Sequence, residues 1–540
     1  MSLATGTHTE AIRALCDAAG CTPETINHAD LMLYRHCRQG RGSRVAIHFN
    51  GRAYSFDQIA DAAARTTSWL LSCGITPGQC VIMSLPDCPM LASTYFGIVA
   101  AGATAVIIDP RLSPEDAFYI AQLSEARLIV AEQDSAGGLT ALQSLPGMIS
   151  LVRAGECWLE PSELADEIAA RSADRVVRQA PRGHACGLLT SGSTGRPKLI
   201  VHRHQDILHG FFGFACDVLE LNSNDCGLCV AKMTTGYGLG CSLLMPFLAG
   251  ARTALLTGPP AGEAVASAVE ASGCTLLFAQ PRFLSDALST EGSIEKLASL
   301  RLVVTGGEPL ADALLDRWSK FSRTELLDSY GSTEIGFLYI SNRPGRKKRR
   351  SVGWPVRGLQ IEIVDQGGNA VRPNEIGRLR VRGPMIIDGY WNEPDRTAES
   401  FQDGWFTTSD LFSVDSDGCY FIHGRSDHLI KLGCGDWVNP IEVECALLEH
   451  PGVRECAVVG SPGEDGLTML KALVALDPIE MPSRAMALEL SRIIRNRWPA
   501  EEHKQVSWFE FVQSLPKTTA GKLDRGKLRP QSMTEFSYRC

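Results

Sequence analysis

The sequence predicts an α/β protein in which doubly wound parallel sheets are followed by a β-rich segment and a small α+β domain. The first observation is that short apolar runs alternate with helix-like stretches. These runs are "CVIMSL" (80–85), "ATAVIID" (103–109), "ARLIVA" (126–131), "CGLLT" (186–190), "CTLLFA" (274–279) and "LRLVVTGG" (300–307). Continuous apolar runs spaced by helical lengths are typical of parallel strands covered on both faces. We therefore expect two α/β subdomains of the doubly wound class.

Two further observations divide the rest of the chain. Close-spaced strands with turns at 352–423 predict a small antiparallel barrel or sheet, and we expect a β-barrel there. Beyond it, a fresh alternation begins: a helix in 439–450, strands at 455–460 and 471–477, and a helix around 487–498. This change of pattern predicts a separate α+β domain. We expect an N-terminal unit at 1–424 and a C-terminal unit at 425–540.

Length and charge exclude several classes of protein. A chain of 540 residues is too long for one ordinary domain. Its net charge of −9 argues against a sequence-independent nucleic-acid binder, which would present a basic face. No stretch approaches the roughly 18 consecutive apolar residues of a membrane span, and the first residues lack a secretory pattern. We expect a cytoplasmic protein with neither nucleic acid nor membrane as a partner.

Some conspicuous residues need no special function. The 18 cysteines are scattered, and we interpret them as reduced thiols. Cys226 and Cys229 form a CxxC without a second pair, so buried structural thiols are favoured over a metal or redox site. The three histidines at 201–209 do not require zinc. The basic run "RPGRKKRR" (343–350) is interpreted as a solvated loop, with docking of an anionic cofactor tail or an acidic partner as the less favoured alternative.

The segment "TSGSTGRPK" (190–198) predicts a loop that holds an anion. Glycines let backbone N–H groups converge on phosphate oxygens, while hydroxyls and a lysine add donors and charge. The spacing differs from GxxxxGK[ST], which argues against a P-loop NTPase. The candidate phosphate-binding residues are Thr190, Ser191, Gly192, Ser193, Thr194, Gly195 and Lys198.

Four more motifs follow in order. "LLDSYGSTEIG" (326–336) offers two carboxylates, an aromatic ring and hydroxyls within a few residues. "GWFTTSDL" (404–411) contains an aspartate whose acceptor-only carboxylate suits two adjacent ribose hydroxyls. "GRSDHLIKLG" (424–433) has an arginine and an aspartate at the expected domain boundary. "LPKTTAGKLDRGKL" (515–528) carries a lysine after glycine near the C-terminus.

In this order and at these distances, the motifs resemble those of the adenylate-forming superfamily of acyl- and aryl-CoA synthetases, carrier-protein adenylation domains and beetle luciferases. The resemblance covers about residues 30–530. Within the superfamily the chain is most similar to benzoate-CoA ligases, through "AKMTTGYGLGCSLLMPFLAGA" (231–251) and "WVNPIEVE" (437–444). It implies a two-step reaction, in which a carboxylate attacks the α-phosphorus of ATP and a thiol then displaces AMP.

The resemblance also implies roles for individual residues. Lys522 would contact both the carboxylate and the nucleotide as charge develops, Glu334 would bind Mg²⁺, and Thr333 would contact the α-phosphate. Tyr330 would stack on adenine, and Asp410 would accept from the ribose hydroxyls. The nucleotide contacts implied outside the glycine-rich loop and these catalytic residues are Gly306, Gly307, Glu308, Asp328, Ser329, Tyr330, Gly331, Ser332, Asp410 and Arg425.

The acid and the thiol would occupy two further regions. The residues implied for a flat aromatic slot are Tyr237, Gly238, Gly240, Ala279, Gln280 and Gly331, with a tight strand-to-helix turn at 237–240 as the competing interpretation. The thiol channel would include Lys431, Gly433 and Trp437. Asp427 would be the hinge about which the C-terminal domain rotates, so that the catalytic lysine leaves and a thiol enters. The loop 431–440 is one residue longer than in the ligases compared, which leaves the identity of the thiol open.

Three functions remain to be distinguished. The first is an ATP-dependent ligase that activates a benzoate-type acid and transfers it to coenzyme A, with Mg²⁺. The second delivers the aryl group to the phosphopantetheine of an acyl carrier protein. The third is a non-catalytic relative that binds a nucleotide or ligand. The expected partners are small molecules, and the expected assembly is a monomer or a homodimer.

Overall fold

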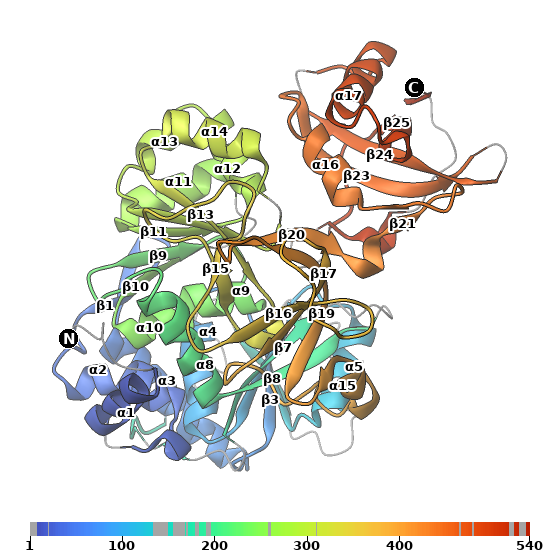
Figure 1. Cartoon of the computed structure of the whole chain (residues 1–540). Coiled ribbons are helices and arrows are strands. Elements are labelled where there is room, and N and C mark those ends of the chain that lie inside the picture. Colours follow the sequence, from blue (N-terminus) through green and yellow to red (C-terminus); the bar gives the residue numbers. More distant parts are fainter. Residues whose placement is uncertain are drawn as a thin grey trace.

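The structure is a computed structural model, and it describes residues 8–19, 21–132, 150–154, 168, 171–175, 177–178, 183–190, 196–256, 261–308, 310–463, 466–477, 480–517, 523–528 and 536–539. Figure 1 shows a large body, and a smaller C-terminal body beyond strand β20 (Tyr420–Arg425). The predicted α/β class is confirmed. Within these ranges no helix is long and apolar enough to cross a membrane.

The first sheet contains the strands expected at 80–85, 103–109, 126–131 and 186–190. Its order is β6-β5-β3-β4-β7-β8, and all its pairs are parallel except β7 with β8. The bounds are β3 (Cys80–Ser84), β4 (Thr104–Ile107), β5 (Leu128–Glu132), β6 (Ser150–Ala154), β7 (His184–Thr190) and β8 (Lys198–Arg203). Between β7 and β8 lies most of the glycine-rich segment.

The second sheet is parallel in its centre and antiparallel at both edges, in the order β15-β14-β13-β12-β11-β9-β10-β1-β2. Its bounds are β1 (Val45–Phe49), β2 (Arg52–Ser55), β9 (Cys226–Cys229), β10 (Arg252–Leu255), β11 (Leu276–Ala279), β12 (Leu302–Gly306), β13 (Glu325–Gly331), β14 (Leu338–Ser341) and β15 (Trp354–Pro355). Alternate residues enter different cores: Leu276 and Val304 face one apolar cluster, while Leu277 and Val303 face another. Both faces are therefore covered, as continuous apolar runs predict.

Helices pack on both sheets. Every residue of α4 (Pro89–Ala100) is buried, as expected for a helix that is apolar all round. Helix α3 (Phe56–Ser72) begins at a capping box, because the Ser55 hydroxyl accepts from the Gln58 N–H and the Gln58 side chain accepts from the Ser55 N–H. Among the described residues, the other α-helices of this body are α1 (His8–Ala19), α2 (Arg35–Arg38), α5 (Pro114–Ser124), α8 (His204–Gly210), α9 (Gly236–Leu239), α10 (Met245–Ala249), α11 (Gly262–Ser272), α12 (Pro281–Ser289), α13 (Ser293–Lys296), α14 (Asp312–Phe321) and α15 (Pro394–Ser400).

The segment at 352–423, expected to form a small antiparallel barrel or sheet, is an open antiparallel sheet. Its order is β16-β17-β19-β18, with β20 also paired to β19. The bounds are β16 (Gln360–Val364), β17 (Gly377–Arg382), β18 (Phe401–Gln402) and β19 (Trp405–Val414). No strand pairing among the described residues joins β16 back to β20, so the ladder forms half a barrel. Its open side faces the rest of the large body, which supplies the apolar surface that closure would otherwise provide.

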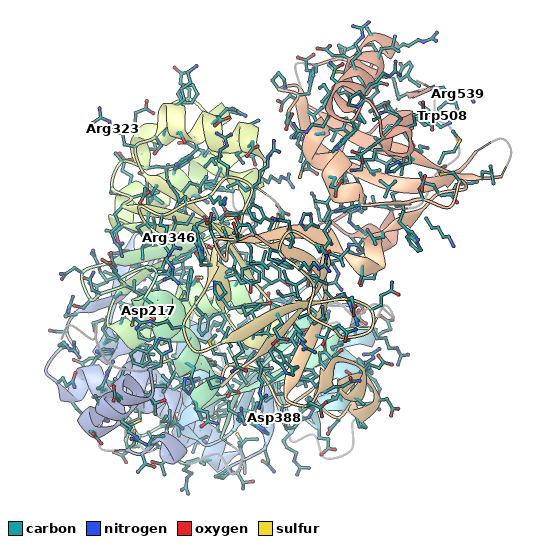
Figure 2. The ribbon with its side chains drawn as sticks, viewed as in Figure 1. Asp217, Arg323, Arg346, Asp388, Trp508 and Arg539 are labelled. Atoms are coloured by element: carbon teal, nitrogen blue, oxygen red, sulfur yellow. The ribbon has the colours of Figure 1, made fainter. Side chains whose placement is uncertain are left out.

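The C-terminal body is the predicted α+β domain. Helix α16 (Pro440–Leu447) and helix α17 (Arg484–Arg497) pack on the sheet β23-β24-β25-β26 and share one apolar core with it. Its strands are β23 (Val453–Pro462), β24 (Thr468–Leu476), β25 (Val506–Phe511) and β26 (Ser537–Arg539), and β21 (Ile430–Lys431) pairs with β22 (Trp437–Val438) as a separate ribbon. Arg539 of β26 lies opposite Trp508 of β25, and Figure 2 labels both residues in the C-terminal body.

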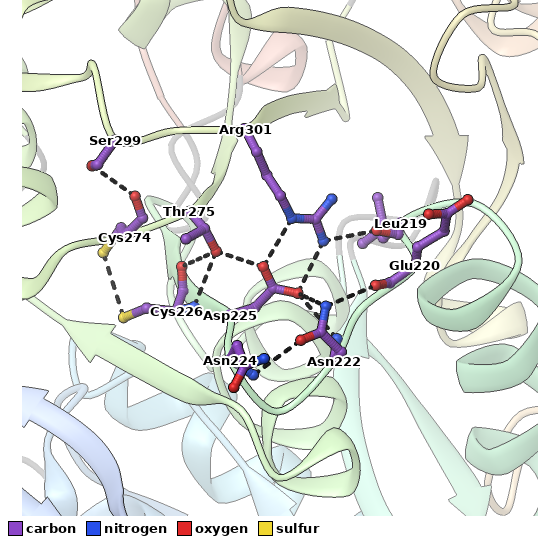
Figure 3. A network of polar contacts seen from close by, with 10 residues as sticks. All are labelled: Leu219, Glu220, Asn222, Asn224, Asp225, Cys226, Cys274, Thr275, Ser299 and Arg301. Carbon is purple, nitrogen blue, oxygen red and sulfur yellow. Dashed lines mark hydrogen bonds and ion pairs between the residues drawn. The ribbon is translucent and has the colours of Figure 1, made fainter. Parts of the chain in front are cut away.

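The CxxC segment is part of the sheet, in agreement with its interpretation as structural. Cys226 and Cys229 are the first and last residues of β9, and both are buried. The Cys226 sulfur lies 3.8 Å from that of Cys274. Figure 3 shows this pair beside a polar network in which Arg301 forms an ion pair with Asp225 at 2.8 Å and Thr275 donates to the same carboxylate at 2.7 Å. The network anchors the start of β9 to its neighbour β11.

Candidate active site

A cavity of about 1810 Å³ lies where the strands of both sheets end and where the half-barrel and the C-terminal domain meet them. Thr190, Gly306 and Gly331 are the last residues of β7, β12 and β13, and all three line it. Ligands of open α/β sheets bind beyond the carboxyl ends of the strands. Each of the five sequence motifs contributes described residues to this one cavity.

The glycine-rich segment enters the cavity from the ends of β7 and β8. Thr190 and Lys198 line it, whereas residues 191–195, with the predicted Ser191, Gly192, Ser193, Thr194 and Gly195, lie outside the described residues. The Lys198 ammonium is 4.0 Å from the centroid of the Tyr390 ring. Burial lowers the pKa of Lys198, because a charged amine loses hydration in the cavity wall. A bound polyphosphate would reverse that effect.

A carboxylate lies opposite this lysine. Glu334 belongs to a single helical turn, Thr333–Ile335, that follows β13, and the Tyr390 hydroxyl donates to its Oε1 at 3.2 Å. Burial raises the pKa of Glu334. Its neighbour Thr333 is held from behind, because His202 Nε2 donates to the Thr333 carbonyl at 2.7 Å. Ser332, Thr333 and Glu334 all line the cavity.

Tyr390 is a functional residue that the sequence reasoning missed. It contacts both Lys198 and Glu334 and lines the cavity. Its segment, "DGYWNEP" (388–394), reads as a turn rich in glycine and proline. An aromatic pair inside such a turn was the only available signal, and it does not indicate which motif the tyrosine approaches.

The predicted adenine and ribose residues lie together. The Tyr330 hydroxyl donates to Asp410 Oδ2 at 2.8 Å, and its ring packs edge-on against Tyr339 and Phe412. Asp410 and Arg425 are cross-strand partners of β19 and β20, and the Arg425 guanidinium lies 3.8 Å from the Asp410 carboxylate. The remaining predicted nucleotide residues that line the same cavity are Gly306, Gly307, Glu308, Asp328, Ser329 and Gly331.

Asp328 is the second carboxylate of that motif. Its Oδ1 accepts from the Thr305 hydroxyl at 3.1 Å and from the Ser329 N–H at 3.0 Å. Burial raises the pKa of Asp328 to about 7, because these two donors offset only part of the lost hydration. The group is consequently poised to accept hydrogen bonds from a ligand that brings donors.

Of the residues predicted for the acid slot, three line the cavity and three pack behind its wall. Tyr237, Gln280 and Gly331 line the cavity, and the Tyr237 hydroxyl donates to the Val304 carbonyl at 3.0 Å. Gly238, Gly240 and Ala279 are buried and are not among the lining residues. A Cβ at Gly240 would lie 2.6 Å from the Phe337 ring, so this glycine permits close packing behind the wall.

The residues assigned to domain rotation and to the thiol lie on the C-terminal side. Arg425 makes two hydrogen bonds to Asp427, at 2.9 and 2.8 Å, and although burial opposes ionisation this guanidinium lowers the pKa of Asp427. Lys431 and Trp437 stand on the β21–β22 ribbon, where the Trp437 side chain is 58% exposed. The proposed thiol residues Lys431, Gly433 and Trp437 do not line the cavity in this arrangement.

Lys522 itself lies outside the described residues, which end at 517 and resume at 523. The residues on both sides are described: Lys517 pairs with Leu523 in an isolated antiparallel bridge, and both line the cavity. The two ends of the segment that carries the predicted catalytic lysine are therefore beside the site.

Other motifs are accounted for by local contacts. Among the described residues no group of three or more histidine, cysteine or acidic side chains has metal-site geometry. In the basic run, Lys347 and Lys348 form ion pairs with Glu325 and Asp415, and Arg346, labelled in Figure 2, lies 4.0 Å from the ring of Trp354. These neighbours favour a solvated structural loop.

Comparison with known proteins agrees with this geometry. Residues 33–391 match the family described as AMP-binding enzyme, and residues 442–522 match the AMP-binding enzyme C-terminal domain. A benzoate–CoA ligase of Thauera aromatica is 31% identical over 94% of this chain and 96% of its own length. A p-hydroxybenzoic acid–AMP ligase of Mycobacterium tuberculosis is 33% identical over 88% of this chain and 65% of its own length. A crystal structure of an anthranilate CoA ligase with anthranoyl-AMP superimposes with a TM-score of 0.87, at 31% identity, over 94% of this chain and 98% of that one.

Proposed function

We propose a substrate and a division of roles for this chain, which belongs to the AMP-binding enzyme family and, within it, to the AMP-forming aryl-acid ligases. The proposed reaction joins a benzoate-type acid to ATP, giving an aryl-adenylate and pyrophosphate, and then transfers the aryl group to coenzyme A with release of AMP. The observation that carries the proposal is that Lys198, Glu334, Asp410 and Arg425, from four separate motifs, meet in one cavity with an aromatic wall.

We propose that the nucleotide spans the ends of the strands. Asp410 accepts from the ribose hydroxyls, and the Arg425 guanidinium lies 3.8 Å from that carboxylate. Tyr330 presents its ring to adenine while its hydroxyl is held by Asp410. Thr190 and Lys198 lie at the other end, where the β- and γ-phosphates leave as pyrophosphate. This arrangement exposes the α-phosphate beside Thr333.

The residues around Glu334 fit a magnesium ion. Mg²⁺ prefers oxygen ligands, keeps several waters and is commonly held by one or two carboxylates with phosphate oxygens. Glu334 supplies one carboxylate at the cavity wall. Burial raises the pKa of this carboxylate, as expected where no cation compensates its charge. When bound, the ion would neutralise phosphate charge, and Tyr390 would orient the carboxylate through its hydrogen bond.

The first step brings two anions together, so the site must neutralise charge as the new bond forms. We assign this role to Lys522, whose ammonium would bridge the attacking carboxylate and the α-phosphate. The described residues on both sides of it line the cavity, which supports the assignment. The thiol must later approach the same carbonyl, and rotation about Asp427 would remove the lysine and admit the thiol past Lys431, Gly433 and Trp437.

For the acid, we propose an aromatic carboxylate whose ring lies against Tyr237. The Tyr237 hydroxyl already donates to a main-chain carbonyl, so this side chain offers the ligand its ring rather than its hydrogen bond. Gln280 also lines the cavity and offers a polar side chain to the ligand. A ring stacked or edge-on against a tyrosine suits benzoate and its substituted relatives.

Incubation with benzoate, substituted benzoates, ATP, Mg²⁺ and free coenzyme A tests the proposal. We expect pyrophosphate and an aryl-CoA in equal amounts. The second candidate is transfer to a carrier protein; it is kept because one similar protein, a p-hydroxybenzoic acid–AMP ligase, is named for its adenylate product and not for coenzyme A. Pyrophosphate release without aryl-CoA would support that candidate over transfer to coenzyme A. No pyrophosphate with any aromatic acid would contradict both.

A further inference from the structure

A buried carboxylate joins the two bodies of the molecule beside the cavity. Glu455 lies on β23 of the C-terminal domain, and only 8% of its side chain is exposed. Its Oε1 is 3.0 Å from a guanidinium nitrogen of Arg282, on α12 of the large body. Its Oε2 is 2.9 Å from the Lys517 ammonium. One carboxylate thus bridges a cation from each body.

The charges and exposure of the residues around Glu455 indicate what neutralising its carboxylate would do. Asp286, on α12 of the large body, experiences the charges of Glu455 and of its partner Arg282, together with those of Arg454 and Asp477, and all five residues line the cavity. A buried carboxylate is stable only when it is paired. The side chains of Arg282 and Lys517 are 46% and 26% exposed, so these cations retain hydration when the carboxylate is neutralised. Removing the charge should therefore loosen the bridge more than it disturbs folding.

The bridge connects directly to the proposed catalytic segment. Lys517 is the last described residue before 518–522, and it pairs across that segment with Leu523. Arg282 is in the first turn of α12, two residues after Gln280, which follows the end of β11. Glu455 therefore connects Lys517, which precedes the proposed catalytic lysine, to the part of the cavity wall where the acid is expected to bind.

We propose that Glu455 is a positioning residue for adenylate formation: its paired contacts with Arg282 and Lys517 hold the C-terminal domain against the large body, with the two described residues that flank the proposed catalytic lysine, Lys517 and Leu523, at the cavity wall. This inference rests on the proposed function. Rotation about Asp427 would separate Glu455 from Arg282, so the bridge stabilises the arrangement for the first step and not that for the second.

The test measures the two half-reactions separately in the full-length enzyme. Adenylate formation is followed by pyrophosphate release with benzoate and ATP, and thioester formation by supplying benzoyl-AMP with coenzyme A. For Glu455→Gln we expect adenylation to slow about tenfold, corresponding to about 1.4 kcal/mol, with thioester formation within twofold of wild type. The matched control is Glu442→Gln, which removes an ion pair to Lys504 inside the C-terminal domain and should change neither rate.

Two further measurements exclude a general effect on folding. Arg282→Gln should slow adenylation similarly, and the double variant with Glu455→Gln should be no slower than Glu455→Gln alone, because Arg282→Gln removes a contact that Glu455→Gln has already removed. Lys517→Gln provides a second route if Glu455→Gln does not fold. Equal loss in both half-reactions, or no loss in adenylation, would overturn the inference. A wild-type enzyme that forms no adenylate would instead refute the proposed function.

Discussion

Substitution of Gly238 by alanine probes how the aromatic wall is built. A Cβ at this position would lie 2.0 Å from the Lys232 carbonyl oxygen, against 3.4 Å for an ordinary contact. That carbonyl is already held by the Thr235 N–H at 2.9 Å and the Thr235 hydroxyl at 2.8 Å. The Gly238 N–H donates to the same hydroxyl at 3.0 Å. Relief of the overlap therefore requires helix α9 to move and this capping to break.

The magnitude follows from these contacts. Overpacking costs about 1–3 kcal/mol and each lost hydrogen bond about 1 kcal/mol, so we expect a loss of roughly 3–5 kcal/mol in unfolding free energy. A cooperative unit of roughly 400 residues has an unfolding entropy near 0.8 kcal/mol/K, which places the decrease in Tm at about 4–6 °C. Displacement of the adjacent Tyr237 by about 1 Å should lower kcat/KM for benzoate by about 100-fold.

Calorimetry and pyrophosphate release measure the two effects. The matched control is Gly236→Ala, where the nearest neighbours of the new Cβ would be 3.7 Å away, at ordinary contact distance. We expect this control to keep its Tm within about 1 °C of wild type. A Gly238→Ala enzyme with wild-type Tm and kcat/KM would refute the reasoning about this helix.

Three other predictions concern the proposed chemistry and acid stability. Lys522→Ala should lower the rate of adenylation by about 100- to 1000-fold while ATP affinity, measured by calorimetry, changes only a few-fold, since its charge is needed mainly in the transition state; unchanged adenylation would refute the assignment. Asp410→Asn keeps the shape of the side chain but loses its charge, so the KM for ATP should rise about tenfold with kcat nearly constant, and an unchanged KM would argue against ribose binding. Burial lowers the pKa of His28 and of His202 to about 4, so both are neutral in the fold, and the unfolded chain binds their protons more tightly below pH 6.5. Unfolding free energy from urea titrations should therefore fall between pH 6.5 and 4 by up to about 1.4 kcal/mol per pH unit for each histidine, with a shallower fall in His202→Gln; identical slopes would contradict a buried neutral His202.

Sequence patterns predicted the strands well because each had a strong local signal. The apolar runs at 80–85, 274–279 and 300–307 became buried parallel strands, and the alternation after 439 became the C-terminal domain. For 352–423 the sequence predicted an antiparallel barrel or sheet, because close-spaced strands do not indicate whether the last strand pairs with the first. In the structure, the large body covers the open side.

Residues of the candidate site could be predicted from the sequence only where they belong to a recognisable motif. Asp410 and Arg425 could be named because their motifs are local, and β19 and β20 place them opposite each other. Tyr390 and Glu455 could not be named, since their partners Glu334 and Arg282 lie far away in the sequence and no spacing rule connects them. The glycines at 238 and 240 were expected at the cavity surface, whereas their missing side chains make room for packing behind it.

The most direct test of the central claim is to identify the bond of ATP that is broken. The enzyme is incubated with benzoate, ATP and Mg²⁺ but without any thiol, and the quenched mixture is analysed by mass spectrometry. The account predicts pyrophosphate together with benzoyl-AMP in equal amounts, since attack at the α-phosphorus releases the β- and γ-phosphates as one unit. Formation of ADP and inorganic phosphate, with no benzoyl-AMP, would contradict it.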